Sequence, residues 1–554
     1  MLGRMMFEAL AGAKLALLAL VLAAGAAHAQ TDPGSLERTV PQLPADQSVA
    51  KPPSVDAPAL PPEGGARFVR KFTLSAVVIE GATVFTAGEL APGFEPYLAS
   101  QVRQAELDTI AANITDRYRK AGFLLSYAVV PAQAVQSGIV RIQVVEGFIG
   151  GVRLKGNGRA AKAVRGIFAG LANERPLRVR TLERAISLAR EVPGAMIGDI
   201  QIGRSAQNPA RHVLTVAVGA NRIRALAYSD NRGTVDGARI RGFSSFNLAS
   251  LAVPGDQLQV DLFAIPYGKF RYLYGQVKGS VPLNSDGLRL TASASYGDQF
   301  QRVSGPNQNG ESRQLAADLG YPFVKSRAFS LSGHLQLADW KSEQEQAGDL
   351  VQRDRFQVGR AWLELRSGTR IRVEGKIGVS RGLDLGNATE KGDPLASRPL
   401  ASARFTKFNA SLQVAAQISK RARLRIESAA QYSAEPLLAL EEFALGGSRI
   451  GRAFDFNEIT GDHGIGGMLE LAYRLDTSNR FIKSAELFTY VDGGGAFRDR
   501  SLPGLPKQQW LAGAGAGARL SATGILWSAE IGVPIALSGR DRDPRIFFSA
   551  TRAF

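Results

Sequence analysis

Apolar and polar residues alternate along the chain from about residue 222 to its end. In residues 288–296 every second residue is apolar, and the residues between them are polar or charged. Residues 371–379 show the same period of two. Because successive side chains of a strand point to opposite faces, each run predicts a strand with one apolar and one polar face.

The segments between these runs alternate in length, as do the short turns and long loops of outer-membrane barrels. The short segments are residues 282–287, 322–327, 366–369, 418–421 and 475–480, and the long ones are residues 298–312, 342–354, 382–402, 433–463 and 498–507. We therefore expect residues 222–554 to form a 16-stranded antiparallel transmembrane β-barrel. The alternative, a soluble β-sandwich, would turn its apolar faces inward and carry similar loops at both ends.

A different pattern precedes the barrel and predicts two modules in tandem. Residues 70–147 predict a strand at 72–79, helices at 86–99 and 106–120, and strands at 124–130 and 139–145. The second of these helices has apolar residues at three- and four-residue spacing, which gives it one apolar face. The same βααββ order is expected again over residues 148–221.

The N-terminal 69 residues predict export rather than a domain. Residues 1–29 combine Arg4 and Lys14, an apolar run and an A-x-A site before Gln30, which is the pattern of a cleavable signal peptide. Residues 30–69 are rich in proline, so we expect a tether, which could also plug a pore. No later segment approaches the 18 consecutive apolar residues of a spanning helix.

The composition limits the classes of molecule that the protein is expected to bind. The formal net charge of +17 suits binding to outer-membrane lipid, lipopolysaccharide or another polyanion. Alternatively, the basic residues line a water-filled lumen. Nucleic acid is not expected as a partner of an exported protein. Cysteine is absent, so neither disulfides nor thiolate metal sites are available.

We find no convincing catalytic, cofactor-binding or metal-binding motif. Residues 378–382 read G-V-S-R-G, which matches the nucleophile pattern of hydrolases around Ser380. That pattern requires a turn from strand to helix, whereas these residues fall in an alternating strand. Residues 513–518 read G-A-G-A-G-A, which mimics a phosphate-binding loop but more often lets a segment pack closely against a wall. We therefore expect no enzyme and no cofactor.

Several short motifs resemble a known family. Residues 79–81 (I-E-G), 118–122 (Y-R-K-A-G), 130–133 (V-P-A-Q) and 144–147 (V-V-E-G) resemble the ShlB-type polypeptide-transport-associated (POTRA) domain. The resemblance continues in the second module and at residues 229–233 (S-D-N-R-G), where the barrel opens. Residues 70–554 as a whole are similar to TpsB transporters of two-partner secretion, the ShlB/FhaC/HecB family.

That resemblance implies a pore lid in the loop at residues 433–463. In the family, this sixth outer loop folds into the pore and ends in a tip beyond a Gly-Gly pair, which here leads to Arg452, Ala453 and Phe454. Gly451 and Ala453 depart from the usual V-R-G-F/Y tip. The family's aspartate on the thirteenth strand falls at Asp492, so we expect Asp492 to anchor the lid and to pair with Arg452 in a partly desolvated pore.

The resemblance also implies location and function. The barrel would lie in the bacterial outer membrane with its POTRA domains in the periplasm, where they capture an unfolded exoprotein of the TpsA type, an adhesin, haemolysin or toxin. The exoprotein would cross the barrel without ATP. Two alternatives remain open at this point: a factor that inserts other barrels into the membrane, and a passive solute porin.

Overall fold

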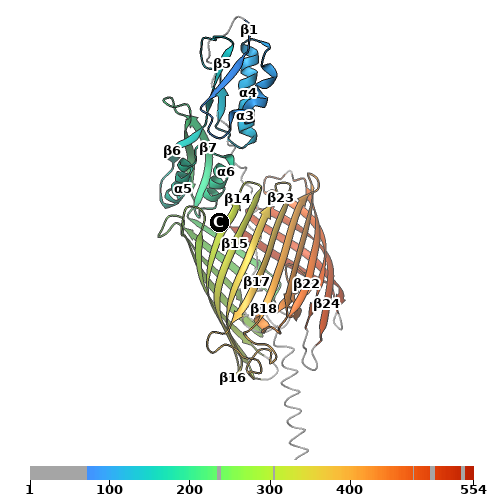
Figure 1. The fold of residues 1–554 in the computed structure, drawn as a ribbon. Coiled ribbons are helices and arrows are strands. Elements are labelled where there is room, and N and C mark those ends of the chain that lie inside the picture. Colours follow the sequence, from blue (N-terminus) through green and yellow to red (C-terminus); the bar gives the residue numbers. More distant parts are fainter. Residues whose placement is uncertain are drawn as a thin grey trace, which may run out of the picture.

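The computed structural model describes residues 71–233, 239–266, 268–302, 306–477, 479–498, 506–537 and 543–554. The expected signal peptide and tether lie outside these ranges. Two small modules follow one another at one end of a large barrel (Figure 1). Among the described residues, no helix is both long and apolar enough to cross a membrane.

The barrel consists of sixteen antiparallel strands in a closed ring, as the sequence predicts. The strands are β9 (Ile223–Asp230), β10 (Arg241–Ala249), β11 (Gln257–Ile265), β12 (Phe270–Pro282), β13 (Arg289–Gln301), β14 (Gln308–Lys325), β15 (Phe329–Gln346), β16 (Asp349–Ser367), β17 (Ile371–Leu383), β18 (Thr406–Gln417), β19 (Ala422–Ser433), β22 (His463–Leu475), β23 (Ile482–Phe497), β24 (Gln508–Ala522), β25 (Ile525–Leu537) and β26 (Arg545–Ala553).

The two faces of the wall differ as the alternation predicts. Leu335 and Leu337 of β15 are 62% and 63% exposed on the outside, whereas Gln344 of β15 and Asp354 of β16 are buried inside. Such a wall places apolar side chains against lipid and polar ones in the lumen. Two of the expected long loops are wrong, since residues 308–312 belong to β14 and residues 342–346 to β15. Backbone pairing continues there because a polar strand can extend beyond the membrane into water.

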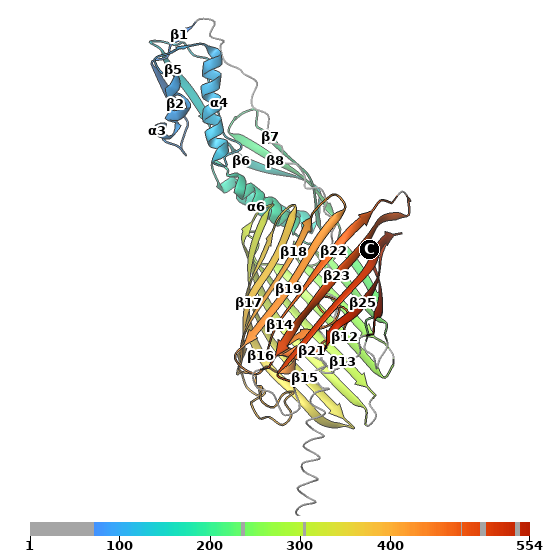
Figure 2. The ribbon, with the colours of Figure 1, turned by 90° about the vertical axis from the view of Figure 1, so that its right-hand side faces the viewer.

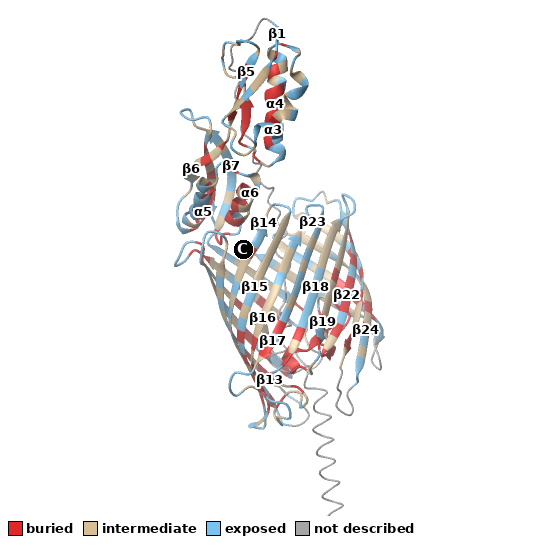
Figure 3. Cartoon of the chain, viewed as in Figure 1, coloured by how far each residue is buried: buried red, intermediate tan, exposed pale blue. Residues whose placement is uncertain are grey.

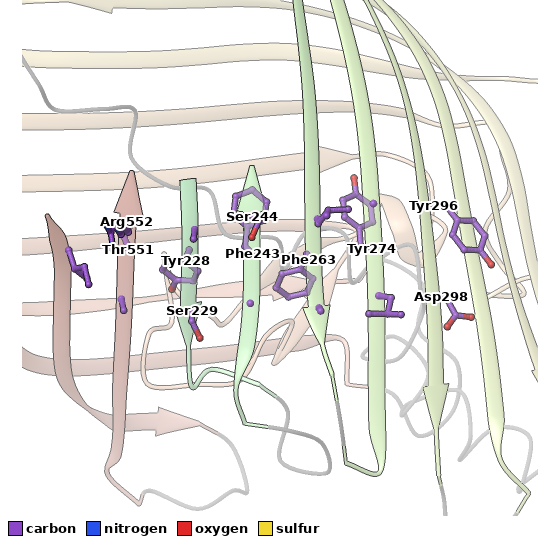
Figure 4. Close-up of a pocket in the computed structure, with 18 residues that line it drawn as sticks. Tyr228, Ser229, Phe243, Ser244, Phe263, Tyr274, Tyr296, Asp298, Thr551 and Arg552 are labelled. Atoms are coloured by element: carbon purple, nitrogen blue, oxygen red, sulfur yellow. The ribbon is translucent and has the colours of Figure 1, made fainter. Parts of the chain in front are cut away.

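The ring closes where β26 meets β9. Only five residue pairs join these strands, from Ser549↔Asp230 to Ala553↔Leu226, whereas eight join β9 to β10. A groove of about 820 Å³ lies beside this seam, lined by residues of β9 to β13, β25 and β26 (Figure 4). The seam is therefore the part of the ring with the shortest strand pairing.

The first module has a three-stranded sheet, β2 (Ala76–Glu80), β5 (Ile139–Val145) and β4 (Tyr127–Val129), with β5 in the centre. The long helix α4 (Gln104–Lys120) buries its apolar face in the core of this module. The short strands β1 (Phe72–Thr73) and β3 (Gln101–Val102) pair separately. The expected helix over residues 86–99 is wrong beyond α3 (Ala87–Leu90), where 3₁₀ turns follow. Pro92 and Pro96 lack the N–H that a continuous helix needs.

The second module repeats the βααββ order. It comprises β6 (Phe148–Lys155), α5 (Arg159–Ala169), the 3₁₀ turn η4 (Gly170–Asn173), α6 (Val179–Arg190), β7 (Ala195–Arg204) and β8 (Arg211–Ala220). Its sheet has the order β6-β8-β7, with β8 in the centre. Both helices bury their apolar faces against this sheet.

The second module rests on the short turns of the barrel (Figure 2). The Arg184 guanidinium on α6 donates hydrogen bonds to the carbonyl oxygens of Asp286 and Pro322, at 3.0 and 2.8 Å. Glu191 forms an ion pair with Lys325 at the end of β14. These contacts fix the module to the turn between β12 and β13 and to the end of β14.

At the opposite end, one long segment turns back into the barrel. Residues 434–462, between β19 and β22, form the 3₁₀ turn η5 (Ala439–Glu441) and a small hairpin of β20 (Phe443–Leu445) and β21 (Ile459–Gly461). The buried residues of the barrel gather toward this end (Figure 3). We call residues 434–462 the lid loop.

Candidate functional site

The lid loop is held in the lumen by an apolar contact. Phe443, Leu445, Ile450, Phe454 and Ile459 of the loop pack in one buried cluster with wall residues of β22, β23 and β24, namely Met468, Ala496 and Leu511. The burial of so many apolar side chains favours the inward position of the loop over a position in water.

Glycines shape the tip of the loop. Gly446, Gly447 and Gly451 have φ angles of 111°, 106° and 83°, a region that favours glycine. A Cβ atom on Gly451 would lie 2.9 Å from the backbone of Gly446. Gly451, which departs from the family pattern, is therefore required by the conformation that this chain adopts.

The Asp492 side chain holds the tip by binding the backbone amides of the tip. The Oδ2 atom of this buried residue on β23 accepts hydrogen bonds from the amides of Gly451 and Arg452, at 2.9 and 2.8 Å. Hydrogen bonds from backbone amides to a carboxylate are among the stronger ones in proteins. The structure therefore brings the predicted Asp492 and the tip of the loop together.

The Arg452 side chain has other partners than the sequence suggested. Its Nη1 lies 2.7 Å from Oε2 of Glu470 on β22, and its Nη2 forms an ion pair with Glu530 on β25. The guanidinium also lies over the Tyr490 ring, 3.9 Å from the centroid, and Arg452 is only 6% exposed. The expected Arg452–Asp492 ion pair is thus replaced by contacts to two glutamates, because the Asp492 carboxylate faces the backbone of the tip.

Further charges extend this site. Arg519 on β24 lies 2.6 Å from Glu470, and Arg232, just after β9, forms an ion pair with Glu530. The network therefore alternates in sign, and each buried glutamate has two arginine partners. Glu470, Glu530 and Arg519 are not predicted from the sequence. Their only signal was a charge on the polar face of a strand, and the barrel has many such charges.

Two glycines of the wall, Gly513 and Gly532, accommodate the tip. A Cβ atom on Gly513 of β24 would lie 3.1 Å from the Cβ atom of Ala453, and one on Gly532 of β25 would lie 3.2 Å from the same atom. Ala453 is fully buried. Gly513 and Gly532 therefore leave room for the tip, whereas Gly515 and Gly517 leave room for the Tyr490 and Phe488 rings.

The hydrolase motif has no matching geometry. Ser380 lies within the regular strand β17, with partners on both sides in the ring, rather than at a turn into a helix. Among the described residues, no group of His, Asp or Glu side chains could hold a metal ion.

Comparisons with known proteins agree with this architecture. The family model of the ShlB-type POTRA domain matches residues 72–147, and that of the haemolysin secretion/activation protein ShlB/FhaC/HecB matches residues 213–520. The chain is 24% identical over 524 residues to the heme/hemopexin transporter protein HuxB of Haemophilus influenzae, covering 89% of each chain.

Two solved structures share the fold. CdiB from Escherichia coli superposes with a TM-score of 0.73 at 17% identity, covering 97% of this chain and 98% of that one. CdiB from Acinetobacter baumannii gives a TM-score of 0.65 at 15% identity, with the same coverage.

Proposed function

The chain belongs to the haemolysin secretion/activation protein ShlB/FhaC/HecB family, and we propose that its lid loop closes the pore through which the exoprotein leaves. The protein is an outer-membrane transporter of two-partner secretion, with its barrel in the outer membrane and its POTRA domain in the periplasm. Its partner is a secreted exoprotein. The lid loop therefore belongs to the cell-surface side of the barrel.

The tip of the lid loop carries this proposal. Arg452 buries a charged side chain between Glu470 and Glu530 while Asp492 binds the backbone of the tip. Removing one partner of a buried ion pair costs about 3–5 kcal/mol, because the other charge is left uncompensated. The inward loop is therefore strongly held, and a passing polypeptide has to displace it.

We propose that capture begins at the periplasmic modules. In the described part of the chain, β2 of the first module pairs only with β5, so its other edge is open to another strand. Val78 on β2 is 44% exposed. An unfolded exoprotein would add a strand there through backbone hydrogen bonds, which tolerate varied sequences.

The second module would act as a second POTRA domain. It has the same βααββ order as the first, and Arg184 fixes it to the turn between β12 and β13 and to the end of β14. An exoprotein bound to it would be held at the mouth of the barrel. Folding outside the cell, rather than ATP hydrolysis, would drive the passage.

The remaining proposals concern the surface. The apolar outer wall would contact outer-membrane lipid, and part of the net charge of +17 would face lipopolysaccharide. Nucleic acid would not be a partner, and the chain would have no enzymatic activity.

The lid is tested by Arg452→Ala in the purified full chain, inserted in planar lipid bilayers. Loss of both ion pairs should increase the fraction of time for which the channel conducts. Arg404→Ala is the matched control, since Arg404 is exposed and pairs with the partly exposed Asp384. Heat-dependent gel mobility reports whether each barrel is folded. Equal conductance of folded Arg452→Ala and wild type would refute the lid.

A further inference from the structure

A second extracellular segment packs against the lid loop. Residues 384–405, between β17 and β18, bury several small and aromatic side chains against the inner face of the wall and against the start of the lid loop. The segment contributes Ala396, Ala401, Ala403 and Phe405, the wall Trp340, Phe356 and Val358, and the lid loop Leu437, Leu438 and Leu440. We call residues 384–405 the second segment.

Arg398 is the polar centre of this contact. Both terminal nitrogens of its guanidinium donate to the Asp462 carboxylate, and Nη1 also lies 3.0 Å from Oε1 of Glu442. Nη1 donates to the carbonyl oxygen of Leu437 at 2.7 Å. The Asp462 and Glu442 side chains are each 1% exposed, so the contact is shielded from water and from salt.

The second segment is fastened to the wall as well. The Leu395 carbonyl oxygen accepts a hydrogen bond from the Arg353 amide at 2.6 Å, and the Ser397 amide donates to Asp354 at 2.9 Å. The Ser397 hydroxyl oxygen accepts from the Ala439 amide of the lid loop at 3.0 Å. The segment therefore connects β16 to the base of the lid loop.

The base of the lid loop, by which we mean residues 437–442 together with Asp462, carries negative charges, whereas the tip carries the positive charge of Arg452. Glu441 pairs with Arg360 of β16 and Lys407 of β18, and Glu442 also pairs with Arg498 beyond β23. The tip instead places a cation among wall carboxylates. The two sets of ion pairs share no residue, so each holds the loop by its own contacts.

We infer that the gate of this transporter has two parts, the lid loop and the second segment, and that Arg398 is the positioning residue that latches one to the other. Opening of the pore then requires the Arg398 contacts with Asp462 and Glu442 to break. This inference rests on the proposed lid function of the loop at residues 434–462.

The test uses the full chain in planar lipid bilayers. Arg398→Ala should raise the fraction of time for which the channel conducts by about tenfold or more, the factor that loss of a charge-assisted hydrogen bond gives in an equilibrium. Arg398→Lys should fall between Arg398→Ala and wild type, because lysine keeps the charge but cannot donate in the forked geometry. Arg404→Ala, in the same segment, should behave as wild type.

A cysteine pair keeps the test decisive if Arg398→Ala fails to fold. The chain contains no cysteine, and the Ser397 hydroxyl already reaches Ala439, so Ser397→Cys with Ala439→Cys can join the second segment to the lid loop. The oxidised pair should suppress openings relative to the reduced pair. Equal conductance of the two forms would overturn the latch.

The outcomes also separate the latch from the lid. If Arg452→Ala opens the pore while folded Arg398→Ala has the same open fraction as Arg404→Ala, the lid function is supported and the latch is refuted. If Arg452→Ala leaves the pore closed, the proposed lid function itself fails.

Discussion

The Arg232 guanidinium donates a hydrogen bond of 2.9 Å to the carbonyl oxygen of Arg452. Arg232 follows β9 and lies over the Phe547 ring of β26, 3.7 Å from the centroid. The tip of the lid loop is therefore bonded to a residue that follows β9 and that itself packs on β26, at the seam that closes the barrel. A displacement of the lid loop removes this hydrogen bond beside the shortest strand pairing of the ring.

Arg232→Ala should loosen the tip without detaching it. The substitution removes the bond to the Arg452 carbonyl and one of the two cations beside Glu530, but leaves Asp492 and Glu470 in place. We expect channel openings intermediate between wild type and Arg452→Ala in planar bilayers. Arg224→Ala, an exposed arginine on β9, is the control. Openings no more frequent than those of this control would contradict the role of Arg232.

Asp492→Ala should be more harmful than Asp492→Asn. Alanine leaves the amides of Gly451 and Arg452 buried without the acceptor that they now share, at a cost of about 1–3 kcal/mol for each unsatisfied group. Asparagine retains one oxygen that can accept. The temperature needed to unfold the barrel on gels should fall from wild type to Asp492→Asn to Asp492→Ala. The open fraction of the channel should rise in the same order. An equal effect of the two substitutions would argue against the backbone contact.

Gly451→Ala should destabilise the inward loop. A residue with a side chain pays about 1–2 kcal/mol for the left-handed conformation at φ 83°, and its Cβ atom would also press on the Gly446 backbone. We expect more frequent openings than in wild type. Gly242→Ala is the control, because a Cβ atom there meets nothing within 4 Å. Wild-type gating in Gly451→Ala would show that the tip can adopt another path.

Glu146 should make the first module sensitive to acid. Burial alone would raise the pKa of this carboxyl, but hydrogen bonds from Thr83, Tyr118 and the Val84 amide outweigh it and lower the pKa. A lowered folded pKa stabilises the module above the unfolded value of about 4.3, and this stabilisation is lost as the pH falls through the folded pKa.

Hydrogen exchange of the α4 amides in the full chain measures this effect. In wild type, exchange should accelerate as the pH falls below about 4.3, beyond the intrinsic pH dependence of exchange. Glu146→Gln should exchange faster than wild type at neutral pH, and its protection should change less in the acid range. Identical pH profiles for the two proteins would rule out Glu146 as the sensor.

Much of this architecture could be predicted from the sequence because each part has a local pattern. The period of two in residues 288–296 and 371–379 indicates a strand on its own, whereas the tip at Arg452 could be placed only through the resemblance to the family. Pro92 and Pro96 disfavour the continuous helix expected over residues 86–99, because neither has an N–H to donate.

The contacts of the site could not be predicted in this way from the sequence. Glu470, Glu530 and Arg519 lie on three strands whose inward residues meet only once the barrel closes and the loop folds inward. The Asp492 contact runs to backbone amides, which every residue carries, so no side-chain pattern encodes it. The second segment likewise has no period, and its place depends on the lid loop.

A disulfide between the tip and the wall tests the central claim most directly. A Cβ atom on Gly513 would lie 3.1 Å from that of Ala453, a few tenths of an ångström closer than the roughly 3.5–4.5 Å of a disulfide, so a small shift of the tip suffices to join cysteines at these positions. The natural chain has no cysteine. Secretion of the exoprotein by Ala453→Cys/Gly513→Cys should stop when the pair is oxidised and return on reduction, while each single variant secretes under both conditions. Undiminished secretion through the fully cross-linked transporter would contradict the displacement of the lid loop.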